Sequence, residues 1–181
     1  MNRNNIPPLG PLALLRYFAR FVSDDAIRKL CTNNTSIPII EELLAIPKEE
    51  PLIGDLVLGE NLEGVKQRIA SVEKDFLFID YGEIVIEQDS SGRMAERSRT
   101  AITVAERLTR FNSEMLIHSL AIDRCLSHCV TIRRAMARDR EMLPKRVLFS
   151  PDVTLMPFSS PELRSVGCTL LFDRLGYNTM K

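Results

Sequence analysis

The sequence has no tryptophan, only four cysteines and two histidines, and no long uninterrupted run of apolar residues. The cysteines, at positions 31, 125, 129 and 168, are too few and too scattered for a disulfide framework, so we expect reduced thiols. The most apolar early stretch, residues 11–22, is interrupted by Arg16 and Arg20, which argues against a membrane span and an ordinary signal peptide. These absences predict a cytoplasmic protein with no membrane association.

The sequence also lacks the signatures of common catalytic and cofactor sites. There is no GxSxG motif, and no glycine-rich loop is followed by Lys-Ser or Lys-Thr. Cys125, His128 and Cys129 have helical spacing, but a second pair of zinc ligands is missing, so buried thiols are the better interpretation. We therefore predict no catalytic residues, no metal and no cofactor, and a protein that is not an enzyme.

One cluster of acidic residues raises the alternative of a magnesium-dependent nuclease site. Its members are Asp80, Glu83, Glu87 and Asp89. A magnesium-dependent nuclease usually adds a lysine on the same strand, whereas Gln88 and Asp89 follow Glu87 here. A solvated acidic strand edge, which also discourages edge-to-edge pairing, is the preferred interpretation.

What the sequence does contain is an ordinary globular composition. It has 181 residues, 45% of them hydrophobic, which suffices for one core of about 150 residues plus an arm. We divide this single domain into a flexible arm over residues 1–10, a helical and irregular N-terminal region over 11–64, and an α+β core over 65–181.

The first regular element is predicted over residues 11–22. Its apolar residues have helical spacing, with Arg16 and Arg20 on the other side, and a proline opens the segment. Ser23 can cap a short continuation that ends near residue 31. The helix either packs into the core or docks on a partner, in which case the docking residues are Leu15, Phe18 and Phe21.

Strand signals begin at residue 75. Two apolar runs, over 76–79 and 84–86, are separated by a bend at Gly82, and residues 89–92 form a turn before a strand over 100–108. The result is an antiparallel hairpin with an arginine-rich arm. This arm consists of Arg93, Arg97 and Arg99.

The longest element is a helix that begins after Asn112 or Ser113 and ends at about Met142, before Pro144. Its expected buried stripe consists of Met115, Ile122, Leu126, Cys129, Val130 and Met136. Its basic surface consists of Arg124, Arg133, Arg134, Arg138 and Arg140. Closing strands follow over 146–149, 153–158 and 165–175. The fold class is therefore α+β: an antiparallel sheet of about four to five strands packed against one long helix, with N-terminal helices.

Charge is unevenly distributed along this neutral chain. Residues 1–23 carry a net charge of +3, residues 24–90 of −9, and residues 91–181 of +6. The two large blocks can neutralise each other within one fold, bind head to tail between copies, or mark a polyanion partner. Binding of nucleic acid is less favoured, because no recognised binding motif is present.

The order of helix, acidic region, arginine-tipped hairpin, long helix and a final strand Gly-Cys-Thr-Leu-Leu-Phe-Asp over residues 167–173 is similar to the tail-terminator or tail-completion proteins of tailed bacteriophages. The resemblance covers residues 65–175. It implies a structural subunit, assembled as a homo-oligomeric ring that is often a hexamer, which ends the tail tube and meets the head connector.

Under this resemblance the protein is cytoplasmic during assembly and then part of the virion or tail particle. The expected inter-subunit or partner contacts are Arg93, Arg97, Arg99, Arg133, Arg134 and Arg138. The alternative is a small regulatory or nucleic-acid-binding module that uses the basic face of the long helix.

Overall fold

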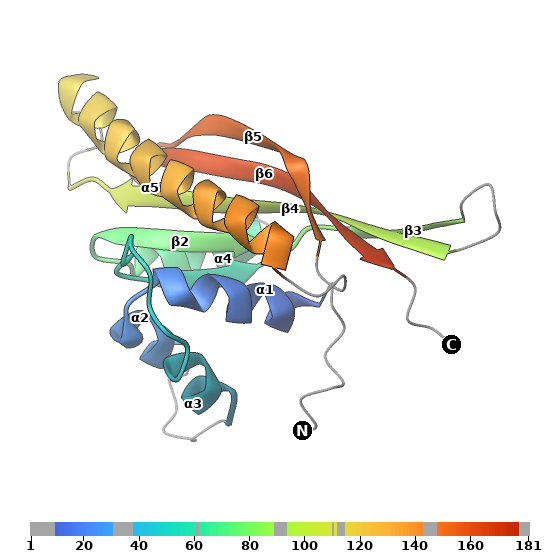
Figure 1. Cartoon of the computed structure of the whole chain (residues 1–181). Coiled ribbons are helices and arrows are strands. Elements are labelled where there is room, and N and C mark those ends of the chain that lie inside the picture. The colour runs from blue at the N-terminus through green and yellow to red at the C-terminus, as the bar shows by residue number, and fades with distance from the viewer. Residues whose placement is uncertain are drawn as a thin grey trace.

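Four helical segments open the described part of the chain, and its strands follow them, in the computed structural model (Figure 1). The structure describes residues 10–30, 38–60, 62–88, 94–109, 111, 115–142 and 148–177. The helical segments are α1 (Pro11–Phe18), the 3₁₀ turn η2 (Ala19–Phe21), α2 (Asp24–Arg28), α3 (Pro38–Leu44), α4 (Leu62–Ala70) and α5 (Met115–Met142). The strands are β1 (Leu56–Gly59), β2 (Asp75–Asp80), β3 (Ile84–Gln88), β4 (Met94–Arg107), β5 (Leu148–Ser160) and β6 (Ser165–Tyr177). Residues 1–9 of the predicted arm lie outside the described residues.

The described strands form one mixed sheet in the order β1-β2-β4-β6-β5, and β3 pairs with β4 beyond the end of β2. The pairings between these strands are antiparallel except that of β1 with β2. The predicted α+β class is thus confirmed. The sheet has six strands rather than four or five, and its one parallel pair arises because α4 connects β1 to β2.

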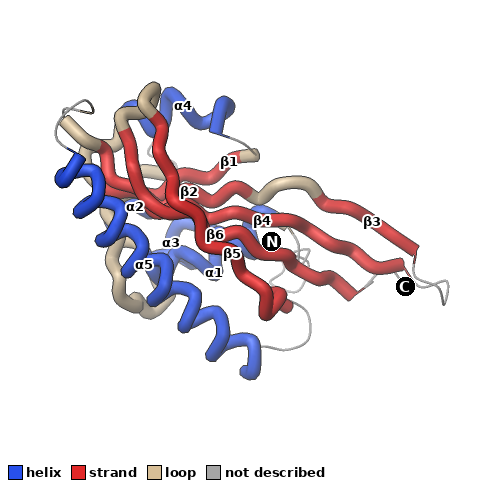
Figure 2. The backbone as a smooth tube through the Cα atoms, turned by 90° about the horizontal axis from the view of Figure 1, so that it is seen from above, coloured by secondary structure: helices blue, strands red, loops and turns tan. Residues whose placement is uncertain are grey.

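The two faces of the sheet differ in what covers them (Figure 2). On the covered face, Ile102, Val104, Leu170 and Phe172 are buried against α1 and α5. On the opposite face, α4 packs over β1 and β2, where a smaller core includes Phe76. The rest of that second face, which we call the open face, carries side chains at least partly accessible to solvent on β4, β5 and β6.

Helix α1 is part of the main core, which is the first of the two alternatives that the sequence left open, and its apolar residues are not available for docking on a partner. Phe18 and Phe21 are fully buried and Leu15 is 6% exposed. The Phe18 ring lies 6.3 Å, centroid to centroid, from the Phe172 ring on β6. The apolar spacing of residues 11–22 correctly indicates a buried helix face, but spacing alone does not reveal whether the same chain covers that face. Ser23 caps α2 as expected, accepting a hydrogen bond from the Ala26 amide (3.1 Å).

Helix α5 runs along the covered face and ends at Met142, as predicted. Its buried stripe is shifted from the expected one. Met115 and Leu126 are exposed, whereas the buried positions are Ala121, Cys125, Cys129, Ile132, Ala135 and Met136. Small residues occupy much of this stripe because the helix lies close to β6, where the Cys129 thiol is 3.4 Å from the Cys168 carbonyl oxygen.

Two element boundaries differ from the sequence predictions. The predicted strand over 100–108 begins six residues earlier, at Met94. The added residues alternate between the two faces of the strand: Arg97 and Arg99 are exposed, whereas Ser98 and Thr100 are buried. Helix α4 is absent from the predictions. It spans the proposed boundary at residue 64, so that boundary does not coincide with a gap between elements.

A cluster of hydrogen bonds and ion pairs connects the α1 region to the last turns of α5. The Tyr17 hydroxyl donates a hydrogen bond to Asp139 Oδ2 (2.9 Å), and Arg20 forms an ion pair with the same carboxylate. The Arg20 guanidinium also lies 4.3 Å from the Tyr17 ring centroid and pairs with Glu49 (3.2 Å). Burial alone would raise the pKa of Asp139, but the hydrogen bonds from Arg20 and Tyr17 prevail and lower it.

This cluster predicts sensitivity to acid. Because the pKa of Asp139 is lower in the folded state, its contribution to stability is complete above the unfolded pKa of about 3.9 and is lost as pH falls through the folded value. Asp139→Asn is expected to lower the free energy of unfolding by about 2 kcal/mol at pH 7, and by less at pH 3. Urea denaturation of the variant and the wild type at both pH values measures this loss in the free energy of unfolding. Asp123→Asn, an exposed position on the same helix, is the control, and equal losses in the two variants would contradict the assignment.

Candidate interaction surface

Exposed charges of the two signs occupy different parts of the described chain. Over residues 24–83, eight acidic and three basic side chains are exposed; we call the acids the acidic surface. They are Asp24, Asp25, Glu41, Glu50, Glu60, Glu63, Glu73 and Glu83. Over residues 97–174 the numbers are reversed, with eight basic and three acidic; we call the bases the basic surface. They are Arg97, Arg99, Arg124, Arg133, Arg134, Arg138, Arg140 and Arg164.

Four arginines of the basic surface lie near the end of α5. Arg138 forms hydrogen bonds with Glu49 Oε2 (2.8 Å) and with Asp139 Oδ1 (3.2 Å). The hydrogen bond to Glu49 is the main reason why the pKa of Arg138 is raised. Its contacts are therefore within the chain. By contrast, Arg133, Arg134 and Arg140 are exposed and form no ion pair with the described residues.

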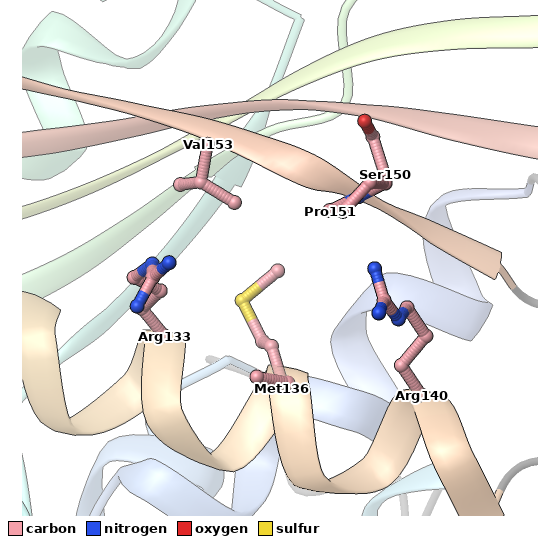
Figure 3. Close-up of a pocket in the computed structure, with 7 residues that line it drawn as sticks. Arg133, Met136, Arg140, Ser150, Pro151 and Val153 are labelled. Atoms are coloured by element: carbon pink, nitrogen blue, oxygen red, sulfur yellow. The ribbon is translucent and has the colours of Figure 1, made fainter.

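Two of these arginines line a pocket of about 180 Å³ between α5 and β5 (Figure 3). Arg133 and Arg140 are two turns apart, and both point toward β5 on either side of Met136. The opposite wall is formed by Ser150, Pro151 and Val153, where the pairing of β5 with β6 is irregular. Two guanidinium groups beside the apolar side chain of Met136 are suited to binding a carboxylate or phosphate group.

The arginines of β4 lie elsewhere. Arg97 donates a hydrogen bond through Nε to Asp173 Oδ2 on β6 (3.1 Å), and Arg99 is directly opposite Asp173 in the strand register. Both point to the open face, whereas α5 lies on the covered face, so the structure does not bring the two predicted arginine groups together. Arg93 lies outside the described residues.

Two of the three buried core thiols, Cys125 and Cys129, are in environments that suppress their reactivity. Burial raises the pKa of Cys125 to about 12, and a hydrogen bond involving Cys168 together with burial raises that of Cys129. Both thiols are therefore protonated at neutral pH. His118 interacts with the Phe111 carbonyl oxygen through Nε2, and no three His, Cys, Asp or Glu residues in the described part of the chain are grouped as metal ligands.

The acidic cluster of the first hairpin has one member in a defined contact. Asp80 Oδ1 accepts a hydrogen bond from the Gly82 amide (3.0 Å), and burial raises the pKa of Asp80. Gly82 has a φ of +57°, which explains why a glycine occupies the predicted bend. Glu83 is exposed, the side chain of Glu87 is not described, and Asp89 lies outside the described residues. Asp80 therefore has a structural contact in the turn.

Comparisons with protein-family models, with curated proteins and with solved structures find no match to this chain. Within the described residues, no helix combines the length and the apolar character needed to cross a bilayer. The fold and the surface chemistry described above are therefore the basis for proposing a function.

Proposed function

We propose that the protein is a non-enzymatic structural subunit of a phage-like tail, which assembles head to tail into a closed ring that ends the tail tube and contacts the head connector. The observation that carries the proposal is that exposed acidic side chains predominate over residues 24–83, whereas exposed arginines predominate over residues 97–174. A single copy leaves three arginines of α5 without an ion pair among its described residues. A neighbouring copy that presents its acidic surface would supply partners for them.

Such a contact joins two different surfaces and is therefore heterologous, and a heterologous contact gives a ring when the rotation between neighbours closes. Complementary charge sets the orientation of the two copies and disfavours contacts between like surfaces. The resemblance to tail-terminator proteins adds the location of the ring, at the end of a tail tube, and its expected size of about six subunits. Assembly would take place in the cytoplasm, and the ring would remain in the tail particle.

Charge reversal of the α5 arginines tests this proposal. In the variant Arg133→Glu/Arg134→Glu/Arg140→Glu we expect association at least about tenfold weaker than in the wild type, because like charges then face each other. Its melting temperature is expected to stay within about 2 °C of wild type, since no described ion pair is lost. Light scattering over a concentration series, with negative-stain images, gives the mass and the presence of rings.

A matched variant reverses the opposite surface, with Glu41→Arg/Glu60→Arg/Glu73→Arg. Each variant alone then has two surfaces of the same sign, whereas an equimolar mixture restores complementary contacts and should recover rings of even size. A wild-type protein that is monomeric at all concentrations, or reversed variants that form rings as well as the wild type, would contradict the proposal. The variant Arg97→Glu/Arg99→Glu, measured in the same way, tests whether the arginines of the open face contribute to association.

A second candidate is a small nucleic-acid-binding module, which is also favoured by the three arginines of α5 that have no ion pair among the described residues. In that case affinity for a DNA or RNA duplex would fall steeply with added salt, and the triple reversal would abolish binding. A monomeric wild type with such binding would replace the ring proposal, whereas rings with no salt-sensitive nucleic-acid binding would retain it.

A further inference from the structure

The pocket between α5 and β5 places two guanidinium groups beside apolar side chains (Figure 3). Arg133, Met136 and Arg140 are three and four residues apart, so they share one face of the helix. Pro151 and Val153 form part of the opposite wall, and the described lining residues include no acidic side chain. The pocket is therefore positively charged at two points and apolar between them.

No described acid neutralises either arginine of this pocket. Both arginines are exposed, and neither forms an ion pair with another described residue. Asp139, which is adjacent to Arg140 in sequence, pairs with Arg20 and does not line the pocket. Asp152 is exposed on β5 and does not line the pocket either. An anion that enters the pocket would therefore meet two guanidinium groups that the described residues leave without a counter-charge.

The spacing of the two arginines favours a ligand with two anionic groups. Seven residues at about 1.5 Å per residue separate them by about 10 Å along the helix axis. Met136 lies between them, so each guanidinium can bind its own carboxylate through two parallel hydrogen bonds (Figure 3). The pocket volume of about 180 Å³ is below the range of about 300–1,000 Å³ found for drug-sized ligands, so the ligand is small.

The apolar side chains of the pocket select among small ligands with two anionic groups. An aliphatic chain is stabilised by contact with Met136 and Val153, whereas the polar linkage of a polyphosphate would lose water there without gaining a hydrogen bond. We propose that the pocket binds a small aliphatic dicarboxylate, with one carboxylate on Arg133, the other on Arg140 and the methylene chain against Met136. The inference does not depend on the proposed ring, although a neighbouring copy in a ring would compete for the same arginines.

A homologous series of dicarboxylates tests whether one ligand spans both arginines. Isothermal titration calorimetry of the wild-type protein with succinate, glutarate, adipate, pimelate and suberate, at equal ionic strength, gives the affinity for each. The protein concentration is kept below the onset of assembly in light scattering, so that no neighbour competes. We expect a maximum of affinity within the series, at least about tenfold tighter than for butyrate, because only a matching chain length engages both arginines. No binding, no maximum within the series, or tighter binding of tripolyphosphate would overturn the inference.

The single variants Arg133→Gln and Arg140→Gln assign the contact to particular residues. Each is expected to bind the best dicarboxylate at least about tenfold more weakly and to lose the dependence on chain length, since one carboxylate then has no guanidinium partner. The melting temperature should stay within about 2 °C of wild type, because neither side chain forms an ion pair with a described residue.

Arg134→Gln is the matched control for these two variants. It removes the same charge from an exposed position of α5 outside the pocket, and it should change the affinity by less than about twofold. Equal losses in all three variants would show a general attraction to a basic helix and overturn the inference. A variant at position 133 or 140 that keeps the maximum of affinity would also overturn it.

Discussion

Phe18→Ala is expected to lower the free energy of unfolding by about 3–5 kcal/mol. Phe18 is 0% exposed, and its ring lies 5.0 Å from the Tyr17 ring in an edge arrangement and 6.4 Å from the Phe21 ring, in addition to its contact with Phe172. Truncation removes this aromatic packing and leaves a cavity between α1 and the sheet, which neighbouring rings can fill only in part. Urea denaturation of the purified variant measures the loss.

Leu116→Ala is the comparison for this experiment, because it truncates a large apolar side chain that is exposed. It should change the free energy of unfolding by no more than about 0.5 kcal/mol. A loss below about 1 kcal/mol for Phe18→Ala would mean that α1 contributes little to the core. Such a result would return α1 to the list of segments available for docking on a partner.

The second large effect is expected at Gly167 on β6, a strand that is paired on both sides. A Cβ atom there would lie 2.1 Å from the Val104 carbonyl oxygen and 2.6 Å from the Ala105 Cα, both backbone atoms of β4. Because Gly167 pairs with Ala105 on β4 and with Phe158 on β5, neither neighbouring strand can move away freely. Gly167→Ala is therefore expected to cost about 3 kcal/mol or more in stability, at the upper end of overpacking effects.

Gly54→Ala provides the matched control. Its nearest obstacle is the Asp75 carboxylate oxygen, 2.7 Å from the added Cβ, and that oxygen belongs to a side chain that can rotate. We expect a loss below about 1 kcal/mol there. Thermal unfolding of the two variants under the same conditions compares them. Similar small losses in both would show that β4 and β6 are not held as closely as described.

The sequence predicts the main architecture because its strongest periodic signals belong to the largest elements. The long helix ends at the expected residue, since Pro144 limits it, and the alternation over residues 166–172 marks β6. Helix α4 is missed because it is short and contains Gly64, which lowers helix propensity, although Val65 and Ile69 have the spacing of a buried helix face. The parallel pairing of β1 is a property of chain topology, and no local pattern reports it.

The candidate surface is predictable only in part. Exposure of Arg133 and Arg134 follows from the helical spacing of the buried stripe. The pairing of Arg138 with Glu49 cannot be predicted from this spacing, because the two residues are 89 positions apart. The exposed apolar residues at the start of α5 have a recognisable signal, because Met115, Leu116 and Ile117 are consecutive and cannot all lie on one stripe. That signal indicates excess apolar surface without showing which turn of the helix projects beyond the sheet.

The contact between α1 and β6 also constrains when the protein can fold during translation. Phe18 packs on Phe172, and β4 obtains its central pairing from β6, so the first helix and the middle of the sheet both depend on the last strand. A nascent chain that still lacks residues 165–177 has no partner for these surfaces, and interactions between distant positions form slowly because a long loop must close. The native core is therefore completed only after the end of β6 has left the ribosome, and incomplete chains are kept out of any assembly that requires the finished subunit.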